Sequence, residues 1–318
     1  MSSPRVSVCI ATYNHERYIR DCIMSVVAQA HDVPLEVLVG DDQSSDRTGE
    51  IVQGLADRFP EIVLYYRHES RLGGCRNYQF LIERAHGEFI AHLDGDDYWL
   101  PRKLAKQVLL MDAHPELSAS YTNALCIDES GDAIAVFNNP QPDTFDFNYL
   151  LARGNFLNNS SMVYRSHAKQ AICDWPTDFV DYKIHLMLGC AGNLGYVNSL
   201  GVAYRVNSSA STILNHGELV RDSYCQAISE YSVDGVVPDL RLSASADFLR
   251  RLFFRSVRLR SLELLRKWWP IVSAANNGKK RKLVLLAALS ILATGYREIL
   301  SRVAASFGGT GLRVMYWR

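Results

Sequence analysis

Paired cysteines are absent from this 318-residue sequence, although it contains seven cysteines. They are widely spaced, odd in number, and never form a C-x-x-C pair: Cys9, Cys22, Cys75, Cys126, Cys173, Cys190 and Cys225. This pattern argues against a disulfide framework and against a zinc site, and it is typical of a reducing compartment. We therefore expect free thiols and a cytoplasmic protein.

Long hydrophobic runs are also missing. The longest, residues 283–296, is 14 residues long, which is shorter than the roughly 20 residues that a helix needs to span a bilayer. No basic-then-apolar leader precedes the first strand pattern at about residue 5, so we expect no signal peptide. The composition, 48% hydrophobic and 21% charged, is that of an ordinary globular protein with one large or two modest domains.

A net charge is lacking overall, but the charges are unevenly spread. Of the 34 Lys/Arg and 34 Asp/Glu residues, sixteen and three respectively lie from Arg241 onward. The preceding part therefore carries a formal charge of about −13 and the tail about +13. This asymmetry indicates a tail that binds a surface.

The rest of the chain is organised around an acidic stretch. An apolar run over residues 89–93 ends in three carboxylates within four residues, Asp94, Asp96 and Asp97. A buried strand that ends this way places acid at the carboxyl edge of a sheet, where open α/β sheets bind ligands. Three like charges repel one another unless a cation lies among them, and hard divalent ions prefer carboxylate oxygens. Taken alone, the triplet is better explained as a solvated acidic loop that caps the next helix, because short acidic motifs recur by chance.

Strand and helix patterns alternate from the start of the chain. Apolar runs at residues 5–12, 35–39, 62–66 and 89–93 are separated by segments with helical spacing. We expect Asn14 to cap the first helix and Pro101 to open the helix after the acidic stretch. This alternation predicts an α/β fold, a mostly parallel sheet with helices on both faces. The strands that end near Asp42 and Asp94 should then bring their carboxylates to one edge.

Three motifs in order carry a family resemblance: V-S-V-C-I-A-T-Y-N at residues 6–14, D-D-Q-S-S-D at residues 41–46 and L-D-G-D-D-Y-W at residues 93–99. Together they resemble the family 2 glycosyltransferases, which have the GT-A (Rossmann-like) fold, over roughly residues 4–210. The resemblance implies a nucleotide diphosphate sugar as the donor, usually linked to UDP, and an inverting reaction.

The resemblance also implies a nucleotide site. Asp42 matches the carboxylate that holds the nucleotide base, and Ala11 and Tyr13 match the tip of the first strand beside that base. Arg76 matches a basic residue near the nucleotide. Each match has a structural alternative, since Asp42 could cap the following helix and Arg76 could be a surface cation at a helix start.

The remaining matches concern the reaction itself. Asp94 and Asp96 match the D-x-D pair, which contacts the ribose and binds a divalent metal, Mn²⁺ or Mg²⁺, on the diphosphate. Asp181 falls where the family places its catalytic base, at the start of a helix in the second half. The match is imperfect, because many relatives carry Glu-Asp where this chain has Val180-Asp181. Asp178 is therefore the alternative base.

Two further segments match less closely. Residues 155–161 lie where relatives contact the donor sugar or the acceptor, although a polar loop before a strand explains them equally well. Residues 204–207 resemble a segment that often reads Tyr-Arg-x-His, but Asn207 stands in the place of the histidine. A contact from that position to the diphosphate or metal is therefore in doubt.

The tail differs from the rest of the chain. Residues 248–260 mix large apolar residues with arginine at helical spacing, and residues 279–282 are all basic. We expect a catalytic domain at residues 1–215 and a helical, basic, amphipathic region at residues 216–318. Basic amphipathic helices with tryptophan can lie in a membrane interface, so we expect peripheral contact with the inner face of the cell membrane. The alternative is a helical subdomain with solvated arginines; a nucleic-acid partner does not fit so apolar a tail.

The predicted function is the transfer of one sugar to a glycan or lipid-linked glycan in cell-surface polysaccharide synthesis, which rests on family analogy. A binding protein that keeps the nucleotide-sugar site without turnover is one alternative. A sugar nucleotidyltransferase is another, but the segment around residues 11–14 lacks the glycine-rich phosphate loop that such enzymes usually carry. No Ser/His/Asp arrangement or reactive cysteine is evident, which agrees with a direct displacement.

Overall fold

The computed structural model describes residues 3–176, 178–206, 222, 226, 238–276, 278–306 and 312–316. The first part alternates strands and helices: β1 (Val6–Thr12), α1 (Ile19–Val27), β2 (Leu35–Asp41), α2 (Thr48–Arg58), β3 (Val63–Arg67), α3 (Gly74–Glu83), β4 (Phe89–Asp94), β5 (Tyr98–Trp99) and α4 (Lys103–Ala113). The middle part contains β6 (Leu117–Ile127), β7 (Ala133–Asn138), β8 (Thr144–Phe145), α5 (Phe147–Arg153), η1 (Asn159–Ser161), β9 (Val163–Arg165), η2 (Ser166–Ala168), α6 (Lys169–Cys173), α7 (Asp181–Ala191) and β10 (Asn193–Arg205). The C-terminal part contains α10 (Pro238–Leu259), α11 (Glu263–Ala275), α12 (Lys280–Ser306) and β11 (Arg313–Tyr316).

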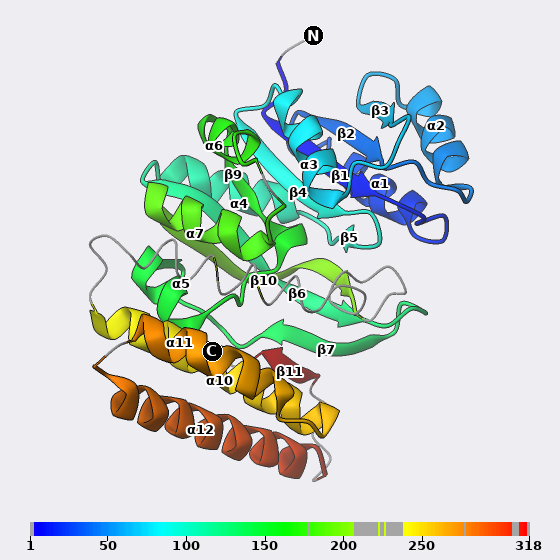
Figure 1. Cartoon of the computed structure of the whole chain (residues 1–318). Helices are drawn as coiled ribbons and strands as arrows, with labels where there is room; N and C mark the ends of the chain where they lie inside the picture. Colours follow the sequence, from blue (N-terminus) through cyan, green and yellow to red (C-terminus); the bar gives the residue numbers. More distant parts are fainter. Residues whose placement is uncertain are drawn as a thin grey trace.

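The described strands form one sheet with the order β11-β7-β6-β9-β4-β1-β2-β3, and β10 joins it beside β6 (Figure 1). Strands β3, β2, β1 and β4 run parallel. Beyond β4 the sheet is mixed, because β9 is antiparallel to both β4 and β6. The predicted α/β fold is confirmed: the parallel half is the part that the alternation of strands and helices predicted.

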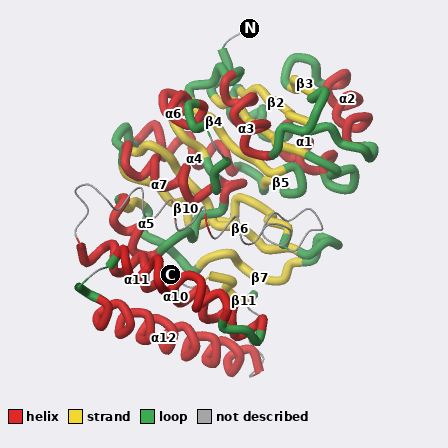
Figure 2. Tube along the Cα trace, viewed as in Figure 1, coloured by secondary structure: helices red, strands yellow, loops and turns green. Residues whose placement is uncertain are grey.

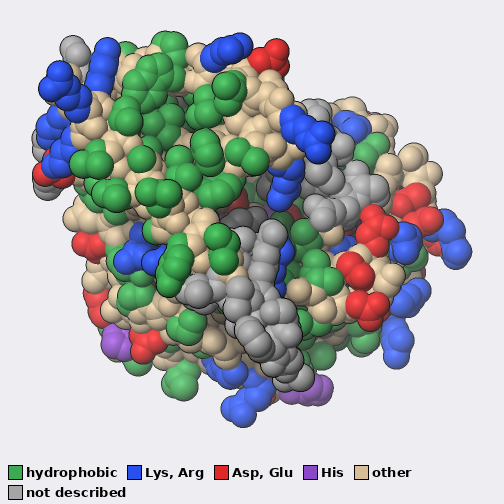
Figure 3. All heavy atoms as spheres, turned by 90° about the horizontal axis from the view of Figure 1, so that it is seen from below, with side chains coloured by type: hydrophobic (Ala, Val, Ile, Leu, Met, Phe, Trp, Pro, Cys, Tyr) green, Lys and Arg blue, Asp and Glu red, His purple; other side chains and the backbone are tan. Residues whose placement is uncertain are grey.

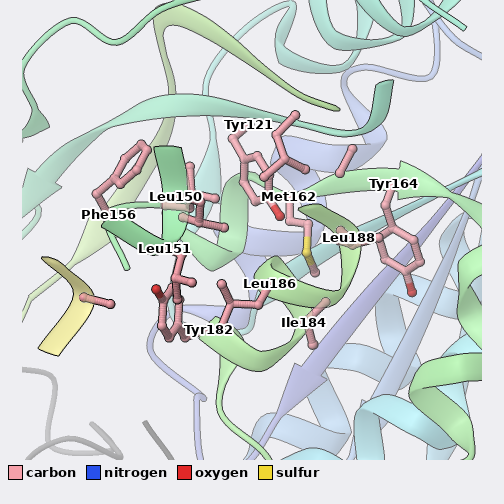
Figure 4. Packing of buried hydrophobic residues seen from close by; sticks show 14 of the residues in the cluster. Tyr121, Leu150, Leu151, Phe156, Met162, Tyr164, Tyr182, Ile184, Leu186 and Leu188 are labelled. Carbon is pink, nitrogen blue, oxygen red and sulfur yellow. The ribbon is translucent and has the colours of Figure 1, made fainter. Parts of the chain in front are cut away.

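Helices cover both faces of this sheet, as Figure 2 shows. One apolar cluster joins the sheet to α1, α2 and α4 through residues such as Ile23, Val52 and Leu104. A second cluster lies on the other face and includes side chains of α3, α6 and α7. Figure 4 shows part of this second cluster, in which Tyr182 and Leu186 of α7 lie near Leu151 of α5. Each face therefore buries its own core, and the strand ends between them stay available for polar residues.

The C-terminal helices pack on the rest of the protein. Figure 1 places α10, α11 and α12 together, next to β7 and β11 and away from β1–β3. Leu242 and Leu252 of α10 and Trp268 of α11 are buried in the same cluster as α5 and α7. None of the described helices is long and apolar enough to cross a bilayer. The C-terminal region is helical as predicted, and it also supplies β11 to the sheet.

Two local predictions were wrong. Asn14 does not cap α1; it has a φ of 55°, and its side-chain oxygen accepts the backbone N–H of Ser45 at 2.8 Å. The helix after the acidic stretch does not begin at Pro101 but at Lys103, because Arg102 has a φ of 62°. At Asn14 a contact with a distant segment replaces the local helix signal, and at Pro101 a local left-handed turn does so.

Candidate active site

The carboxyl ends of β1, β2 and β4 lie side by side at one edge of the sheet. Ala11 at the end of β1 pairs with Gly40 of β2 on one side and with Asp94 of β4 on the other. The backbone N–H of Asp42 donates to the carbonyl of Thr12 at 2.9 Å, just beyond β2. The prediction that two acidic strand ends share one edge is therefore confirmed.

Gly95 allows the chain to pass closely over the end of β1. Its N–H donates to the carbonyl of Ala11 at 3.0 Å. A Cβ atom at this position would lie 2.7 Å from both Thr12 Oγ1 and His15 Nδ1. Those two side chains are themselves in hydrogen-bond contact at 3.1 Å, so the space above β1 is filled.

We expect Gly95→Ala to lower the free energy of unfolding by about 1–3 kcal/mol, because an added methyl group would overpack this contact. Urea unfolding followed by circular dichroism would measure the change. Gly54→Ala is the matched control: a Cβ there, in the middle of α2, meets nothing within 4 Å, and alanine should stabilise the helix by about 0.5–1 kcal/mol. Equal unfolding free energies for the wild type and Gly95→Ala would contradict the close packing.

Ser160 lies between two carboxylates of the acidic stretch. Its Oγ is 3.2 Å from Asp94 Oδ2 and 2.6 Å from Asp97 Oδ2, so its hydroxyl can donate to either. The other oxygen of Asp94 faces His92 Nε2 at 3.1 Å. The other oxygen of Asp97 accepts the backbone N–H of Arg205 at 2.8 Å. Asp97 is buried, whereas the Asp94 side chain is 43% exposed, so only Asp94 of this pair can reach a ligand directly.

Arg205 at the end of β10 fixes the loop that carries the carboxylates. Its Nε donates to the carbonyl of Asp96 at 3.1 Å, and its Nη1 donates to the carbonyl of Asp128 at 2.6 Å. The guanidinium also stacks 4.1 Å from the ring centre of Tyr18. These contacts hold the backbone of the acidic loop against β10 and leave the Asp96 side chain partly exposed.

The three neighbouring carboxylates differ in how readily they ionise. Burial, together with the charges of Asp96 and Asp94, raises the pKa of Asp97 well above its ordinary value. The Asp94 side chain is only partly exposed, which works against its ionisation, but the interaction with His92 and the hydrogen bond from Ser160 outweigh this, so the pKa of Asp94 is lowered. The repulsion within the triplet is thus relieved at the buried Asp97, and the exposed Asp94 keeps its charge.

The donor set at this edge fits a hard divalent cation bound together with a ligand. Asp94 and Asp96 offer carboxylate oxygens at the surface of the site. Among the described residues no group of three or more His, Cys, Asp and Glu side chains is arranged to hold a metal ion. Magnesium-type ions are commonly bound by one or two carboxylates, with phosphate oxygens and water completing the shell. Two carboxylates are therefore sufficient if the ion arrives with a diphosphate.

The predicted base-binding side of the site lies at the end of β2. The carboxylate of Asp42 accepts the backbone N–H groups of Leu72 and Gly73, at 2.6 and 3.0 Å. Arg71 lies 3.7 Å from this carboxylate and places its guanidinium 3.7 Å from the ring centre of Tyr13. Asp42 does not cap α2; the N–H of Thr48, the first residue of that helix, donates to Asp46 Oδ1 at 3.0 Å instead. Tyr13 and Asp42 therefore lie on either side of the Arg71 guanidinium. Arg71 was not predicted from the sequence.

Arg76, the predicted cation, is exposed on the first turn of α3. Its guanidinium donates to the side chain of Gln79 at 3.1 Å and to the carbonyl of Pro176. Arg76 therefore contacts the segment that leads into α7. It remains a prediction that this residue approaches a nucleotide.

The two candidate bases lie in different surroundings. Asp181 is the first residue of α7, and its carboxylate accepts the backbone N–H of Tyr182 at 2.7 Å and Asn155 Nδ2 at 3.1 Å. Burial raises the pKa of Asp181 and the charge of Asp94 raises it further, while the hydrogen bonds and His92 oppose this. Asp178 is exposed, and its charge acts instead on the Cys75 thiol. Of the two candidates, Asp181 is thus the one whose ionisation is affected by the acidic strand end.

Several contacts of the site could not be assigned from the sequence. Ser160 and Asn155 fall in the polar segment 155–161, and Arg205 falls in the segment 204–207, but their partners within the protein could not be predicted from those segments. Asn207 lies outside the described residues. His185, one turn after Asp181, gave no signal beyond helical spacing.

The α/β sheet thus gathers carboxylates at the carboxyl ends of β1, β2 and β4, the edge at which open α/β sheets bind ligands. A family model described as Glycosyl transferase family 2 matches residues 7–168, and the chain belongs to this family. An uncharacterized protein of Mycobacterium tuberculosis is 32% identical over 205 residues, covering 63% of this chain and 58% of that protein. The match thus spans little more than half the length of this mycobacterial relative.

A second relative is the Escherichia coli protein WfaP, a UDP-Glc:α-D-GlcNAc-diphosphoundecaprenol β-1,3-glucosyltransferase. It is 27% identical over 219 residues, covering 69% of this chain and 84% of WfaP.

Solved structures show the same fold. Residues 1–349 of S. aureus TarS in complex with UDP-GlcNAc match with a TM-score of 0.63 and 18% identity, covering 92% of each chain. The mannosyltransferase PcManGT from Pyrobaculum calidifontis in complex with GDP-Man and Mn²⁺ matches with a TM-score of 0.55 and 18% identity, covering 92% of this chain and 88% of that one.

Proposed function

We propose that this protein is an inverting, metal-dependent glycosyltransferase of the hexosyltransferase type. It would move a sugar from a UDP-linked donor to a hydroxyl of a glycan or lipid-linked glycan in cell-surface polysaccharide synthesis. The observation that carries the proposal is the position of Asp181, which opens α7 within electrostatic reach of Asp94 and His92 on β4. UDP-GlcNAc in the TarS complex and the lipid-linked acceptor in the name of WfaP support the choice of donor and acceptor class.

Asp181 would act as the general base. In an inverting transfer, the acceptor oxygen forms a bond to the anomeric carbon while the bond from that carbon to the diphosphate oxygen breaks. The hydroxyl proton passes to the carboxylate, and the nucleoside diphosphate leaves with the bonding electrons. One carboxylate opposite the leaving group is sufficient for this step. The raised pKa of Asp181 makes it a stronger base than an ordinary aspartate.

Asp94 and Asp96 would hold the divalent cation. When bound, such an ion supplies positive charge to the departing diphosphate. Ser160 and Arg205 would keep the acidic loop in position through the contacts described above. The Mn²⁺ in the PcManGT complex supports a metal in a protein of this fold.

Asp42, Tyr13 and Ala11 would form the nucleotide end of the site. Asp42 already orders the loop at Leu72 through two backbone N–H groups. These bonds hold its carboxylate at the end of β2, and Arg71 lies between that carboxylate and the ring of Tyr13, so a nucleotide base would bind next to these residues. Arg76 would lie nearer the diphosphate, on the first turn of α3.

The test is nucleotide release from UDP-, GDP- and dTDP-sugars with Mn²⁺ or Mg²⁺, with water as the acceptor. Slow release of a nucleoside diphosphate from one donor supports the proposal and identifies that donor. Release of pyrophosphate would indicate a nucleotidyltransferase instead. Binding of a donor by calorimetry without release, even with glycan acceptors added, would indicate a binding protein without turnover.

We also propose that the protein docks on the inner face of the cell membrane through one face of residues 216–318, the predicted C-terminal region, beside a catalytic domain at residues 1–215. Figure 3 shows hydrophobic side chains gathered in the upper left of the view, with Lys and Arg along the left edge. On α12 these residues recur at helical spacing and are 51–69% exposed: Val284, Leu285, Leu289, Leu292, Tyr296 and Ile299. Such a stripe needs a covering surface.

Charge favours anionic lipid as that surface. The exposed cations on and between these helices are Arg258, Arg260, Arg266, Lys267, Lys280, Arg281, Lys282 and Arg297. The exposed acids described there are Asp239 and Glu263. A second copy of the chain would bring like charges together, whereas each Lys or Arg near an anionic membrane contributes about 1 kcal/mol.

We expect the double substitution Leu285→Glu and Leu292→Glu to reduce the fraction bound to phosphatidylglycerol-containing vesicles by more than about tenfold, because it removes apolar area that the membrane would cover and adds negative charge. Co-sedimentation at low salt measures this, and the wild type should dissociate as salt is raised. Leu109→Glu is the control, since Leu109 is 71% exposed on α4. If the wild type does not sediment with these vesicles at low salt, the proposed contact is wrong.

A further inference from the structure

Asn155, in the turn after α5, connects the candidate base to the C-terminal helices. Its side-chain nitrogen donates to Asp181 Oδ2 at 3.1 Å, and its side-chain oxygen lies 3.1 Å from His185 Nδ1. Its backbone carbonyl accepts a hydrogen bond from Arg251 of α10 at 2.8 Å. Three segments far apart in the sequence therefore meet at one amide residue.

The orientation of the Asn155 amide is determined by its neighbours. The backbone N–H of Leu157, 3.4 Å from Oδ1, can only donate. His185 is fully buried, and burial lowers its pKa to about 3. The ring is therefore neutral and carries one proton, which must be on Nδ1 to donate to the same oxygen. With two donors on Oδ1, the NH₂ group of the amide faces Asp181.

The carboxylate of Asp181 is consequently held at both oxygens by neutral donors. Oδ1 accepts the backbone N–H of Tyr182 at 2.7 Å, and Oδ2 accepts the Asn155 amide. Tyr182 is itself fully buried in the core shown in Figure 4. The ionisation of Asp181 is also affected by His92 and Asp94 of β4, and Asp181 in turn affects the Tyr121 hydroxyl of β6.

Arg251 fixes the main chain that carries this amide. Its Nε pairs with Asp247 Oδ2 at 2.8 Å while its Nη2 reaches the Asn155 carbonyl. Arg250, the preceding residue, also pairs with Asp247 but directs its Nη1 to Thr294 Oγ1 of α12. Of these two adjacent arginines, it is Arg251 that contacts Asn155.

We propose that Asn155 is a positioning residue for the catalytic base, with His185 setting its amide orientation and Arg251 of α10 holding its backbone. This inference rests on the proposed role of Asp181. It makes the C-terminal helix a part of the scaffold of the active site. A neutral donor fixes the direction of the carboxylate without the strong charge stabilisation that an adjacent cation would give, so the base stays reactive.

Asn155→Ala should lower the rate of donor hydrolysis by about 10–100-fold, by analogy with residues that orient metal ligands through one hydrogen bond, while KM for the UDP-sugar stays unchanged. The lost hydrogen bond favours the ionised form of Asp181, so the acid limb of the pH–rate profile should move to higher pH. Arg251→Met should shift the same limb in the same direction. Arg250→Met, the matched control, should lower thermal stability without moving the limb.

Asp181→Asn separates this inference from the proposed function. If that variant keeps the wild-type rate, Asp181 is not the base and the proposed function fails. If it loses activity while Asn155→Ala keeps the wild-type rate and pH profile, the positioning role alone is overturned. Equal pH–rate profiles for Arg251→Met and Arg250→Met would overturn the contribution of α10 to positioning the base. Calorimetric measurement of the affinity for UDP confirms that each variant retains its fold.

Discussion

Replacing Asp181 with asparagine is expected to lower the rate of sugar transfer, or of donor hydrolysis, by about 10²–10⁴-fold, the range associated with loss of a general base. The substitution keeps the size of the side chain and one hydrogen-bond-accepting oxygen, so the start of α7 should remain folded. The affinity for UDP should change little, because Asp181 lies on the α7 side of the site and the nucleotide residues lie at the ends of β1 and β2. Initial rates and calorimetry on the same preparations measure both quantities.

The pH dependence of the wild type provides a second check on Asp181. The base must be ionised, so the rate falls as pH decreases through its pKa. Burial raises the pKa of Asp181 above the ordinary aspartate value, and Asp94 adds to the effect. The decline should therefore begin at a higher pH than an exposed aspartate would give. The residual activity of Asp181→Asn should not show this decline of the rate at low pH.

Asp178→Asn is the matched control, because Asp178 is an acidic residue three positions earlier that is exposed. Its rate and pH profile should equal those of the wild type. A large loss of rate in Asp178→Asn, together with a near-normal rate in Asp181→Asn, would show that Asp178 is the base and Asp181 is not.

The framework of the site could be predicted because it depends on strand order. Residues at the ends of parallel strands share an edge whatever their side chains do, so the alternation of strands and helices was enough to bring Asp42 near Asp94. The register confirms this, with Ala11 between Gly40 and Asp94.

The supporting contacts could not be predicted because they join segments that are distant in the sequence. Arg205 lies 108 residues from Asp97, whose carboxylate accepts its backbone N–H. Arg251 lies 96 residues from Asn155. No periodicity or local motif encodes such pairs; they depend on how β10 and α10 are placed by the core.

Local helix signals failed where a tertiary contact or a left-handed turn replaced them. Asn14 is a good helix cap by residue type, but its side chain is used at Ser45. The turn at Arg102 similarly delays α4. Both errors lie beside the candidate site. There the residues stabilise the loops at the sheet edge and do not cap or begin the neighbouring helix.

Replacing Asp96 with asparagine is expected to remove metal-dependent activity and to lower the rate by about 10²–10³-fold, since a bound cation contributes several kcal/mol of charge stabilisation. The fold should survive, because Arg205 holds Asp96 through its backbone carbonyl, which the substitution leaves in place. Calorimetry with UDP should show that Mn²⁺ strengthens binding to the wild type and has little effect on the variant. Asp21→Asn, on the exposed side of α1, is the control and should respond to Mn²⁺ like the wild type.

Chelation distinguishes a metal role of Asp96 from a general loss of structure. EDTA should reduce the wild-type rate to that of Asp96→Asn, and it should not reduce the variant further, because both treatments remove the same interaction. Additive losses would mean that the metal and Asp96 act separately. An unchanged wild-type rate in EDTA, with full activity in Asp96→Asn, would show that the carboxylates on the Gly95 turn hold no catalytic cation.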